Sequence, residues 1–230
     1  MTAFVPPLAP IVVLAFLGSA FLLAVAAATI LYAAFSGKRR LILPTLVGAA
    51  ALLAIYGATL LSASALSKEQ VLRAGEKKYF CEIDCHIAYS IEDVEIASHL
   101  GVAPGAVRAA GQFHVVTLRA WFDESTISSR RARDIPLSPN PRIVYVRDAE
   151  GRTYQPSVPG QEALAAIGRL STPITTPLRP GESYNVYMVF DLPRDARDPR
   201  LFLGNAPGVE FVLIGHEMSP WHKKVWFALR

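Results

Sequence analysis

The sequence predicts an integral membrane protein in which a hairpin of two transmembrane helices precedes a mainly β domain, an antiparallel β-sandwich. Two long stretches, residues 8–35 and 41–67, contain no charged side chain, which predicts the hairpin. From residue 79 onward, short runs rich in Val, Ile, Tyr and Phe alternate with Pro- and Gly-containing turns, which predicts the sandwich. The expected organisation is a helical hairpin over residues 1–67, a linker over 68–78 and an extracytoplasmic β domain over 79–230.

Each uncharged stretch is long enough to cross a bilayer. A hydrocarbon core about 30 Å thick needs roughly 20 apolar residues in a helix that rises about 1.5 Å per residue. A cleaved signal peptide is the alternative for the first stretch, and it would carry a basic segment before a short apolar core. Residues 1–10 contain no Lys or Arg and the apolar run is too long, so we expect a true anchor.

The residues between the two stretches predict the orientation. Lys38, Arg39 and Arg40 follow one another there, and such cations mark the cytoplasmic side of a membrane protein. Residues before the first span and everything after residue 67 would then lie outside the cytoplasm, both termini included. Four cations beyond the second span oppose this orientation, but they are interleaved with glutamates and weigh less: Lys68, Arg73, Lys77 and Lys78.

The charge of the expected outer part is nearly balanced. The chain has 23 Lys and Arg and 19 Asp and Glu, and removing the three cations of the cytoplasmic turn leaves 20 basic residues against 19 acidic ones. A nucleic-acid-binding domain carries a pronounced basic surface, so no nucleic acid is expected as a partner. The expected partners are the lipid bilayer and another membrane or extracytoplasmic protein.

The β domain is expected to contain short strands and a single short helix. Gln161–Leu170 is the helix, and turns are expected at Asp148–Gly151 and Arg179–Glu182, where Gly accompanies polar residues or Pro. The strands are expected at residues 79–97, 113–122, 142–147, 152–155, 183–192, 209–214 and 224–229.

Residues Tyr145–Leu203 carry three short motifs. They are D-x-x-G-x-x-Y (Asp148, Gly151 and Tyr154), P-G-E (Pro180–Glu182) and F-D-L-P (Phe190–Pro193). In these motifs the segment resembles bacterial immunoglobulin-like domains of unknown function that are anchored by N-terminal membrane segments. The resemblance implies an immunoglobulin-like antiparallel β-sandwich, and that family has no catalytic residues to transfer to this chain.

Both cysteines lie in YFCEIDCH, residues 79–86, and four arrangements suit them. On a regular strand Cys81 and Cys85 would share one face as buried thiols, about 13 Å apart and too far for a disulfide. In a turn they could form a local disulfide, which cysteines outside the cytoplasm commonly do. With His86 they could bind a metal. The fourth arrangement is covalent haem, although C-x-x-x-C-H is one residue longer than the usual C-x-x-C-H.

Thiolate and imidazole ligands together suit copper and zinc. Of these two metals, copper is the one expected on an outer surface. Two spans followed by a β domain with C-x-x-x-C are similar to the copper-bearing subunit of haem–copper oxidases. In that family the motif lies near the end of the domain, with a His four residues after the second Cys. Here the motif opens the domain, His86 follows Cys85 directly and position 89 is Tyr89, which departs from the family.

A second group of ligating residue types lies near the C-terminus, in GHEMSPWH over residues 215–222. His216 and Met218 could complete a copper site with the cysteine cluster, or Met218 could be the second axial ligand of a haem. The alternative is an ordinary polar turn between strands, which we favour unless the two groups converge. The candidate metal ligands are therefore Cys81, Cys85, His86, His216 and Met218.

The sequence contains no recognisable enzymatic motif. G-x-S-x-G, the P-loop, H-E-x-x-H and G-x-G-x-x-G are all missing from it. The expected function is therefore that of a membrane-anchored extracytoplasmic binding or scaffold module without enzymatic activity. The alternative is a copper-binding or redox accessory protein that uses Cys81, Cys85 and His86.

Overall fold

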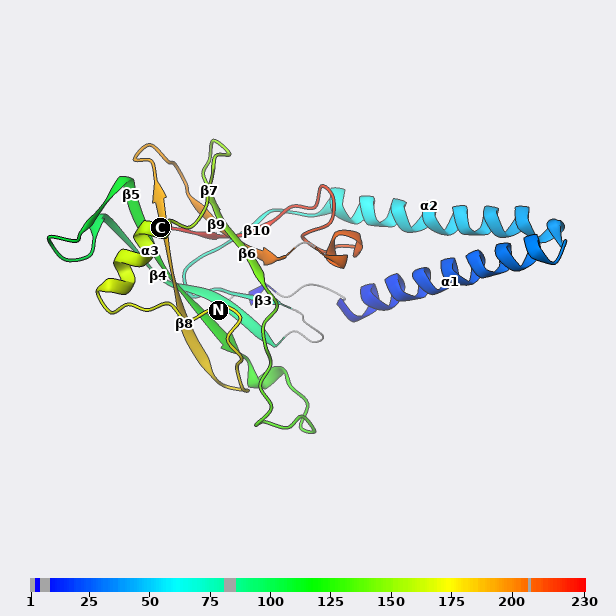
Figure 1. The fold of residues 1–230 in the computed structure, drawn as a ribbon, viewed down its shortest axis with the longest axis horizontal. Helices are drawn as coiled ribbons and strands as arrows, with labels where there is room; N and C mark the ends of the chain where they lie inside the picture. Colours follow the sequence, from blue (N-terminus) through cyan, green and yellow to red (C-terminus); the bar gives the residue numbers. More distant parts are fainter. Residues whose placement is uncertain (1–2, 5–8, 81–85, 207) are drawn as a thin grey trace. The chain divides into compact units, whose positions relative to one another are not determined.

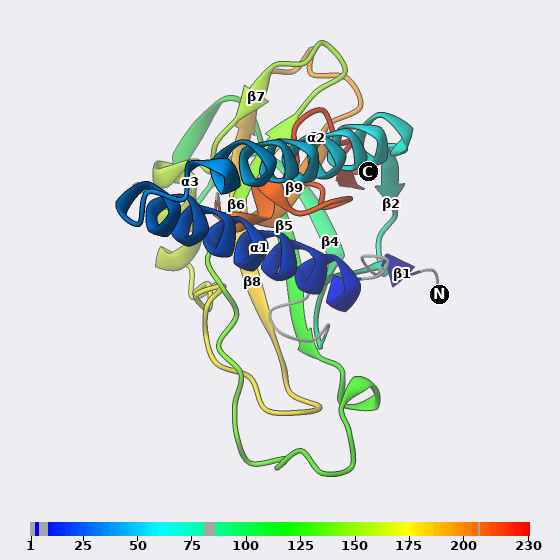
Figure 2. The ribbon, with the colours of Figure 1, turned by 90° about the vertical axis from the view of Figure 1, so that its right-hand side faces the viewer.

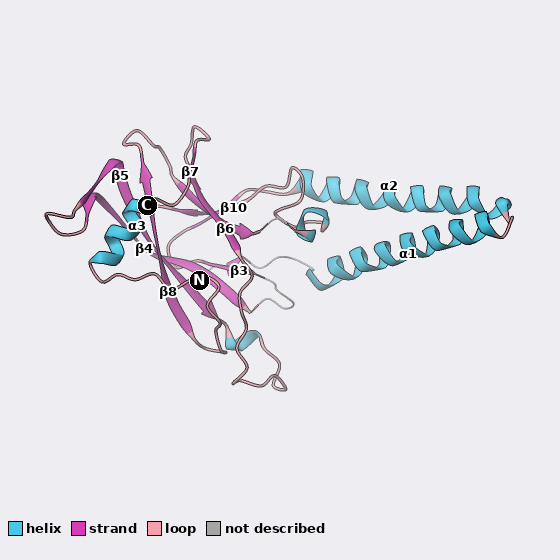
Figure 3. Ribbon diagram, in the orientation of Figure 1, coloured by secondary structure: helices cyan, strands magenta, loops and turns pink. Residues whose placement is uncertain are grey.

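The computed structural model describes residues 3–4, 9–80, 86–206 and 208–230. Within these ranges the chain divides into two compact units, which interleave along the sequence. The strands belong to the first unit and the long helices to the second (Figure 3). The first unit comprises Met1–Pro6, Glu69–Ala206 and Lys224–Arg230, and the second comprises Pro7–Lys68 and Pro207–Lys223.

The second unit is built on a helical hairpin. Helices α1 (Ala9–Phe35) and α2 (Ile42–Leu66) run antiparallel and are joined through a 3₁₀ turn, η1 (Arg39–Leu41) (Figure 1). Both helices are long and apolar enough to cross a membrane. Large apolar side chains point outward from them, including Phe21, which is 67% exposed, and Leu43, which is 70% exposed.

The first unit contains two sheets among its described residues (Figure 2). One sheet has the strand order β1-β3-β4-β5-β8, in which β1 is parallel to β3 and the other neighbours are antiparallel. Its strands are β1 (Ala3–Phe4), β3 (Lys77–Phe80), β4 (Ile87–Leu100), β5 (Val107–Phe122) and β8 (Ser183–Leu192).

The other sheet has the strand order β2-β10-β9-β6-β7, in which β2 is parallel to β10 and the other neighbours are antiparallel. Its strands are β2 (Gln70–Leu72), β10 (Val225–Ala228), β9 (Arg200–Asn205), β6 (Arg142–Arg147) and β7 (Thr153–Tyr154). The expected sandwich is thus present in its coarse form, two layers of strands that enclose a core.

The core lies between the two sheets, and the strands fill it by alternation. In β8, Val186, Phe190 and Leu192 point into the core, where they meet Leu201 and Phe227 of the other sheet. Successive strand residues point to opposite faces, so Tyr187 and Val189 of β8 cannot enter this core. They lie in a second, smaller apolar cluster on the outer face of the first sheet.

Helix α3 (Val158–Ala166) covers part of that outer face. Its Leu164 is fully buried and packs in the smaller cluster with Phe113 of β5 and Val189 of β8. The helix begins three residues before the predicted one because the Ser157 hydroxyl accepts the Gly160 N–H and caps it. It also ends four residues earlier than predicted.

Several predicted elements are confirmed and others are corrected. Strands β6 and β8 match the predicted 142–147 and 183–192, and β5 and β10 overlap the predicted 113–122 and 224–229. The continuous strand predicted over 79–97 is wrong, because Phe80 and Ile87 are antiparallel partners and the chain reverses between them.

Two further differences concern the ends of the β domain. The strand predicted over 209–214 is wrong, since this segment forms a 3₁₀ helix, η3 (Val209–Val212), and belongs to the unit of the long helices. The expected linker over residues 68–78 contains strand β2 and the first two residues of β3.

Candidate functional site

The predicted metal ligands are distributed over the chain in three parts. Cys81 and Cys85 lie outside the described residues. His86 belongs to the first compact unit, where it directly precedes β4. His216 and Met218 belong to the second unit. Among the residues that are described, no group of three or more His, Cys, Asp or Glu side chains could hold a metal ion.

His86 is held firmly in place. The residue is 3% exposed, and its ring stacks on Phe122 at the end of β5, with ring centroids 5.5 Å apart and planes 12° apart. Its Nδ1 lies 2.6 Å from the Thr126 hydroxyl, which in turn donates to the Asp123 carbonyl at 2.7 Å. A hydroxyl has one proton, so both contacts are made together only if Nδ1 of His86 carries a proton. The neutral ring then has its lone pair on Nε2.

Asp123 is the centre of this polar cluster. Its buried carboxylate accepts the Tyr79 hydroxyl at 2.5 Å and both the backbone N–H and the hydroxyl of Ser125. The Asp123 N–H donates to the His86 carbonyl at 2.9 Å. The Asp123 carboxylate thus ties the end of β5 to β3, and the Asp123 backbone N–H ties it to His86, which directly precedes β4.

The same contacts shift two pKa values in this cluster. Burial alone would raise the pKa of Asp123, but hydrogen bonds from Ser125 and Tyr79 outweigh it and lower the pKa. Burial, together with the neighbouring carboxylate of Asp123, raises the pKa of Tyr79 far above its usual value. At neutral pH the pair is therefore a charged Asp123 and a neutral Tyr79 that donates to it.

His216 and Met218 form a local turn. The backbone N–H of Met218 donates to Nδ1 of His216 at 3.1 Å. Because Nδ1 accepts this bond, the neutral ring carries its proton on Nε2. Neither ring nitrogen presents a lone pair to a metal in this geometry, so ligation by His216 would require the turn to rearrange.

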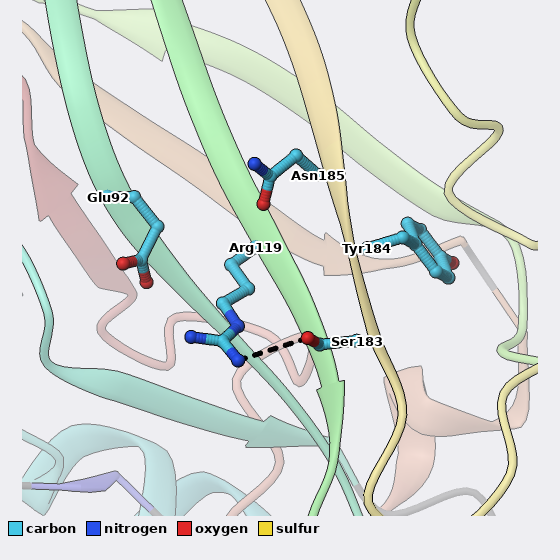
Figure 4. A pocket seen from close by; sticks show the side chains of 5 residues that line it. All are labelled: Glu92, Arg119, Ser183, Tyr184 and Asn185. Carbon is cyan, nitrogen blue, oxygen red and sulfur yellow. Dashed lines mark hydrogen bonds between the residues drawn. The ribbon is translucent and has the colours of Figure 1, made fainter.

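A surface depression of about 420 Å³ lies on the outer face of the first sheet, on the part that α3 leaves uncovered. Figure 4 shows the side chains of Glu92, Arg119, Ser183 and Asn185 around it, from β4, β5 and β8, together with the ring of Tyr184. Arg119 Nη2 donates to Ser183 Oγ at 3.0 Å. A guanidinium cannot accept the proton of a hydroxyl, so this pair is no activated nucleophile. The depression suits polar contacts with another molecule.

The first unit also contains a buried lysine that sequence reasoning missed. Lys78 is 1% exposed, and its Nζ reaches across the core to donate to the carbonyls of Leu203 at 2.6 Å and Val225 at 3.3 Å. The rings of Phe80 and Phe202 lie 5.1 and 5.0 Å from the ammonium. Lys78 therefore links the two sheets by charge-assisted hydrogen bonds.

Asp123 is the other residue of this region that was not foreseen. Its sequence context, Asp123 followed by Ser125, carries a recognisable signal, because Asp side chains often accept the N–H two residues ahead of them. Tyr79 gave no signal of its own. Its partner lies 44 positions further along the chain.

No protein-family model matches the sequence, and no curated protein matches it. Two solved structures are similar to parts of the chain. A conserved hypothetical protein from Bacillus anthracis is 18% identical, with a TM-score of 0.39, over 51% of this chain and 82% of its own. The secreted protein MPT63 from Mycobacterium tuberculosis is 13% identical, with a TM-score of 0.41, over 72% of this chain and 99% of its own.

TM-scores this low establish no common fold, so these two similarities carry no functional assignment. None of these comparisons supports the resemblance of the chain to the copper-bearing subunit of haem–copper oxidases.

Proposed function

We propose that this protein is a membrane-anchored extracytoplasmic binding or scaffold module, with an immunoglobulin-like sandwich and no enzymatic activity. The observation that carries the proposal is the hairpin α1–α2, whose outward side chains are large, apolar and exposed. Such a surface is unfavourable in water and suits the hydrocarbon of a bilayer. The three short motifs of residues 145–203 support the immunoglobulin-like assignment.

The pairing of β1 supports the proposed topology. Ala3 pairs with Lys77 and Phe4 with Lys78, so the residues that precede α1 belong to the same unit as those that follow α2. Both ends of the hairpin then lie on one side of the membrane, and the turn between the helices lies on the other. The turn carries Lys38, Arg39 and Arg40, which favours a cytoplasmic position for the turn. The first compact unit, called the β unit from here on, would then lie outside the cytoplasm.

Two of the four cations that oppose this orientation, Lys77 and Lys78, make contacts within the β unit. Lys78 is buried in the core. Lys77 lies over the Trp121 ring, with Nζ 3.5 Å from the ring centroid. Cations that contact the protein in this way contribute less to orientation than the exposed cluster of the turn. This supports the β unit as the outer part.

Reporter fusions test the proposal in cells. Alkaline phosphatase, which is active only outside the cytoplasm, is expected to be active when fused after Arg230 and inactive when inserted at Gly37 in the turn. Green fluorescent protein at the same two positions provides the reciprocal control, because it becomes fluorescent at Gly37. Phosphatase activity at Gly37 with none after Arg230 would overturn the proposed topology, and release of the protein by alkaline carbonate would overturn the anchor.

A copper-binding or redox accessory function is the second candidate, and the geometry of His86 favours it. The Thr126 contact requires a proton on Nδ1 of His86, and in that neutral tautomer Nε2 is the nitrogen that can bind a metal. Cys81 and Cys85 precede His86 by five positions and one position and would be the thiolate ligands. His216 and Met218 belong to the other compact unit, and their part in a metal site stays a prediction of the sequence.

Elemental analysis of protein purified without chelator tests this candidate. About one equivalent of copper is expected under it, and Cys81→Ser or Cys85→Ser should reduce copper to background. His99→Ala, at an exposed position of β4, is the matched control and should leave the copper content unchanged. Wild-type protein with copper at background would rule the candidate out, and thiol counting would then separate a disulfide from buried thiols.

A further inference from the structure

Residues 208–223 carry an apolar surface that the proposed function does not use. The segment contains η3 and a series of tight turns, and it belongs to the same compact unit as α1 and α2. Its large apolar side chains point away from the protein. Trp221 is 78% exposed, Val209 61% and Phe211 57%.

The segment is attached to α2 at two levels. Lys223 N donates to Ser67 Oγ at 2.8 Å, just beyond the end of the helix. The Tyr56 hydroxyl donates to the Val212 carbonyl at 2.7 Å, well inside the helix. Ser67 lies 11 positions after Tyr56, which corresponds to about 16 Å along a helix axis. The segment therefore runs along α2, from the level of Tyr56 at Val212 to the end of the helix at Lys223, and η3 lies beside the helix (Figure 1).

We propose that residues 208–223 form a third membrane contact, a segment that dips into the outer leaflet and places Val209, Phe211 and Trp221 among the lipids. The inference rests on the proposed spanning of the hairpin. With the cytoplasmic boundary at Ile42, just after Arg40, about 20 helical residues cross the hydrocarbon and end near Leu61. Tyr56 then lies roughly 7 Å below the outer boundary.

The depth of Tyr56 is characteristic of interfacial segments, whose apolar faces are buried about 5–10 Å into the boundary between headgroups and acyl chains. Ser62, Ser64 and Ser67 follow Leu61 and suit the headgroup layer. Trp is enriched at this boundary, because its ring is apolar and its N–H is polar. Lys223 is exposed at the level of Ser67, where lipid phosphates lie.

Several backbone polar groups of residues 208–223 are hydrogen-bonded within the protein, as a segment surrounded by lipid requires. Non-helical backbone at membrane depth must have its polar groups bonded within the protein. Successive tight turns bond Phe211 N to Gly208 O, Leu213 N to Glu210 O and His216 N to Leu213 O. Tyr56 satisfies the Val212 carbonyl, and the Ser219 hydroxyl donates to the Leu213 carbonyl.

Quenching of tryptophan fluorescence by brominated lipids tests the inference. The full chain is reconstituted in phosphatidylcholine vesicles, with or without bromine on the upper part of the acyl chains. We expect the bromines to quench the wild-type protein by up to about a third of its emission, since Trp221 is one of three tryptophans. Trp221→Phe, which retains an aromatic ring at an exposed position, should lose this quenching.

A second variant separates a lipid contact from an effect on folding. Phe211→Trp in the Trp221→Phe background should restore quenching, because position 211 is also placed among the lipids. Equal quenching of wild type and Trp221→Phe, in protein that floats with the vesicles on a density gradient, would overturn the third contact alone. Failure to float would overturn the anchor, and this inference with it.

Discussion

Replacing Gly111 with alanine is expected to lower the free energy of unfolding of the β unit by about 3 kcal/mol. A Cβ on Gly111 would lie 2.1 Å from the Leu192 carbonyl oxygen and 2.8 Å from Pro193 Cα, and these are backbone atoms that no rotamer change can move. Two hydrogen bonds from β5 to the Asp191 side chain of β8 also hold the two strands together at this point. The Asp191 carboxylate accepts the N–H groups of Ala110 and Gly111 at 2.7 and 2.9 Å.

Thermal unfolding, followed through the buried Trp226, measures this effect. For a chain of this size each kcal/mol moves Tm by about 2–4 °C, so Tm should fall by roughly 6–12 °C. Gly105→Ala is the matched control, because its Cβ would meet only the Val102 carbonyl oxygen at 3.7 Å, an ordinary contact. A Tm for Gly111→Ala equal to that of Gly105→Ala would show that β5 and β8 do not approach one another this closely.

Replacing Asp148 with alanine is expected to cost about 2–3 kcal/mol. Asp148 is 5% exposed and lies in the hairpin between β6 and β7. Its carboxylate accepts the Arg152 backbone N–H at 2.8 Å, the Arg152 Nε at 2.6 Å and the Tyr154 hydroxyl at 2.8 Å. Alanine leaves a half-buried hydroxyl and a guanidinium without this acceptor. Asp195→Ala is the matched control, since it removes a 73% exposed carboxylate from the same Arg152 and should cost less than about 1 kcal/mol.

The effect of Asp148 is expected to depend on pH, with a defined sign. Burial alone would raise the pKa of Asp148, but hydrogen bonds from Tyr154 and Arg152 lower it. A carboxyl group whose pKa is lower in the folded state stabilises the fold above its unfolded pKa, about 3.9, and loses this contribution as pH falls through the folded value. The stability difference between wild type and Asp148→Ala should therefore be full near neutral pH and shrink below about pH 4. A difference independent of pH would contradict this account.

Strand periodicity predicted much of the β unit. The alternation in SYNVYMVFDL located β8 to the residue, because one face packs in the core and the other under α3. Strand β9 was missed because its residues Leu201–Asn205 are all buried. A central strand with both faces covered shows no alternation, and its short apolar run carries no period.

Long-range contacts account for the parts that could not be predicted. The segment VEFVLI has the composition of a strand, yet Val212 is bonded to Tyr56, 156 positions away, instead of to a neighbouring strand. Composition reports the residue types of a segment and not its partner. The reversal between Phe80 and Ile87 was likewise hidden, because the alternation of residues 79–87 fits one continuous strand as well as the two arms of a hairpin.

The candidate site was predicted in part. His86 was singled out by sequence as a candidate ligand, and the structure adds the acceptor that sets its tautomer, Thr126, which lies 40 positions away. Lys78 was counted only among the cations that oppose the expected orientation, and its burial was not predicted, because lysines are almost never fully buried unless they have partners. Its partners are backbone carbonyls of β9 and β10, which carry no side-chain signature in the sequence.

The pairing of Ala3 and Phe4 with β3 has a consequence for how the protein is made. These residues leave the ribosome long before Lys77 and Lys78. Under the proposed topology, they would therefore be exported before both helices and their partner strand have been synthesised. If a peptidase cut the chain between β1 and α1, the β unit would stay attached to α2. Its first sheet, however, could lose the edge strand β1. The exposed backbone of β3 would then offer a template for pairing with another chain.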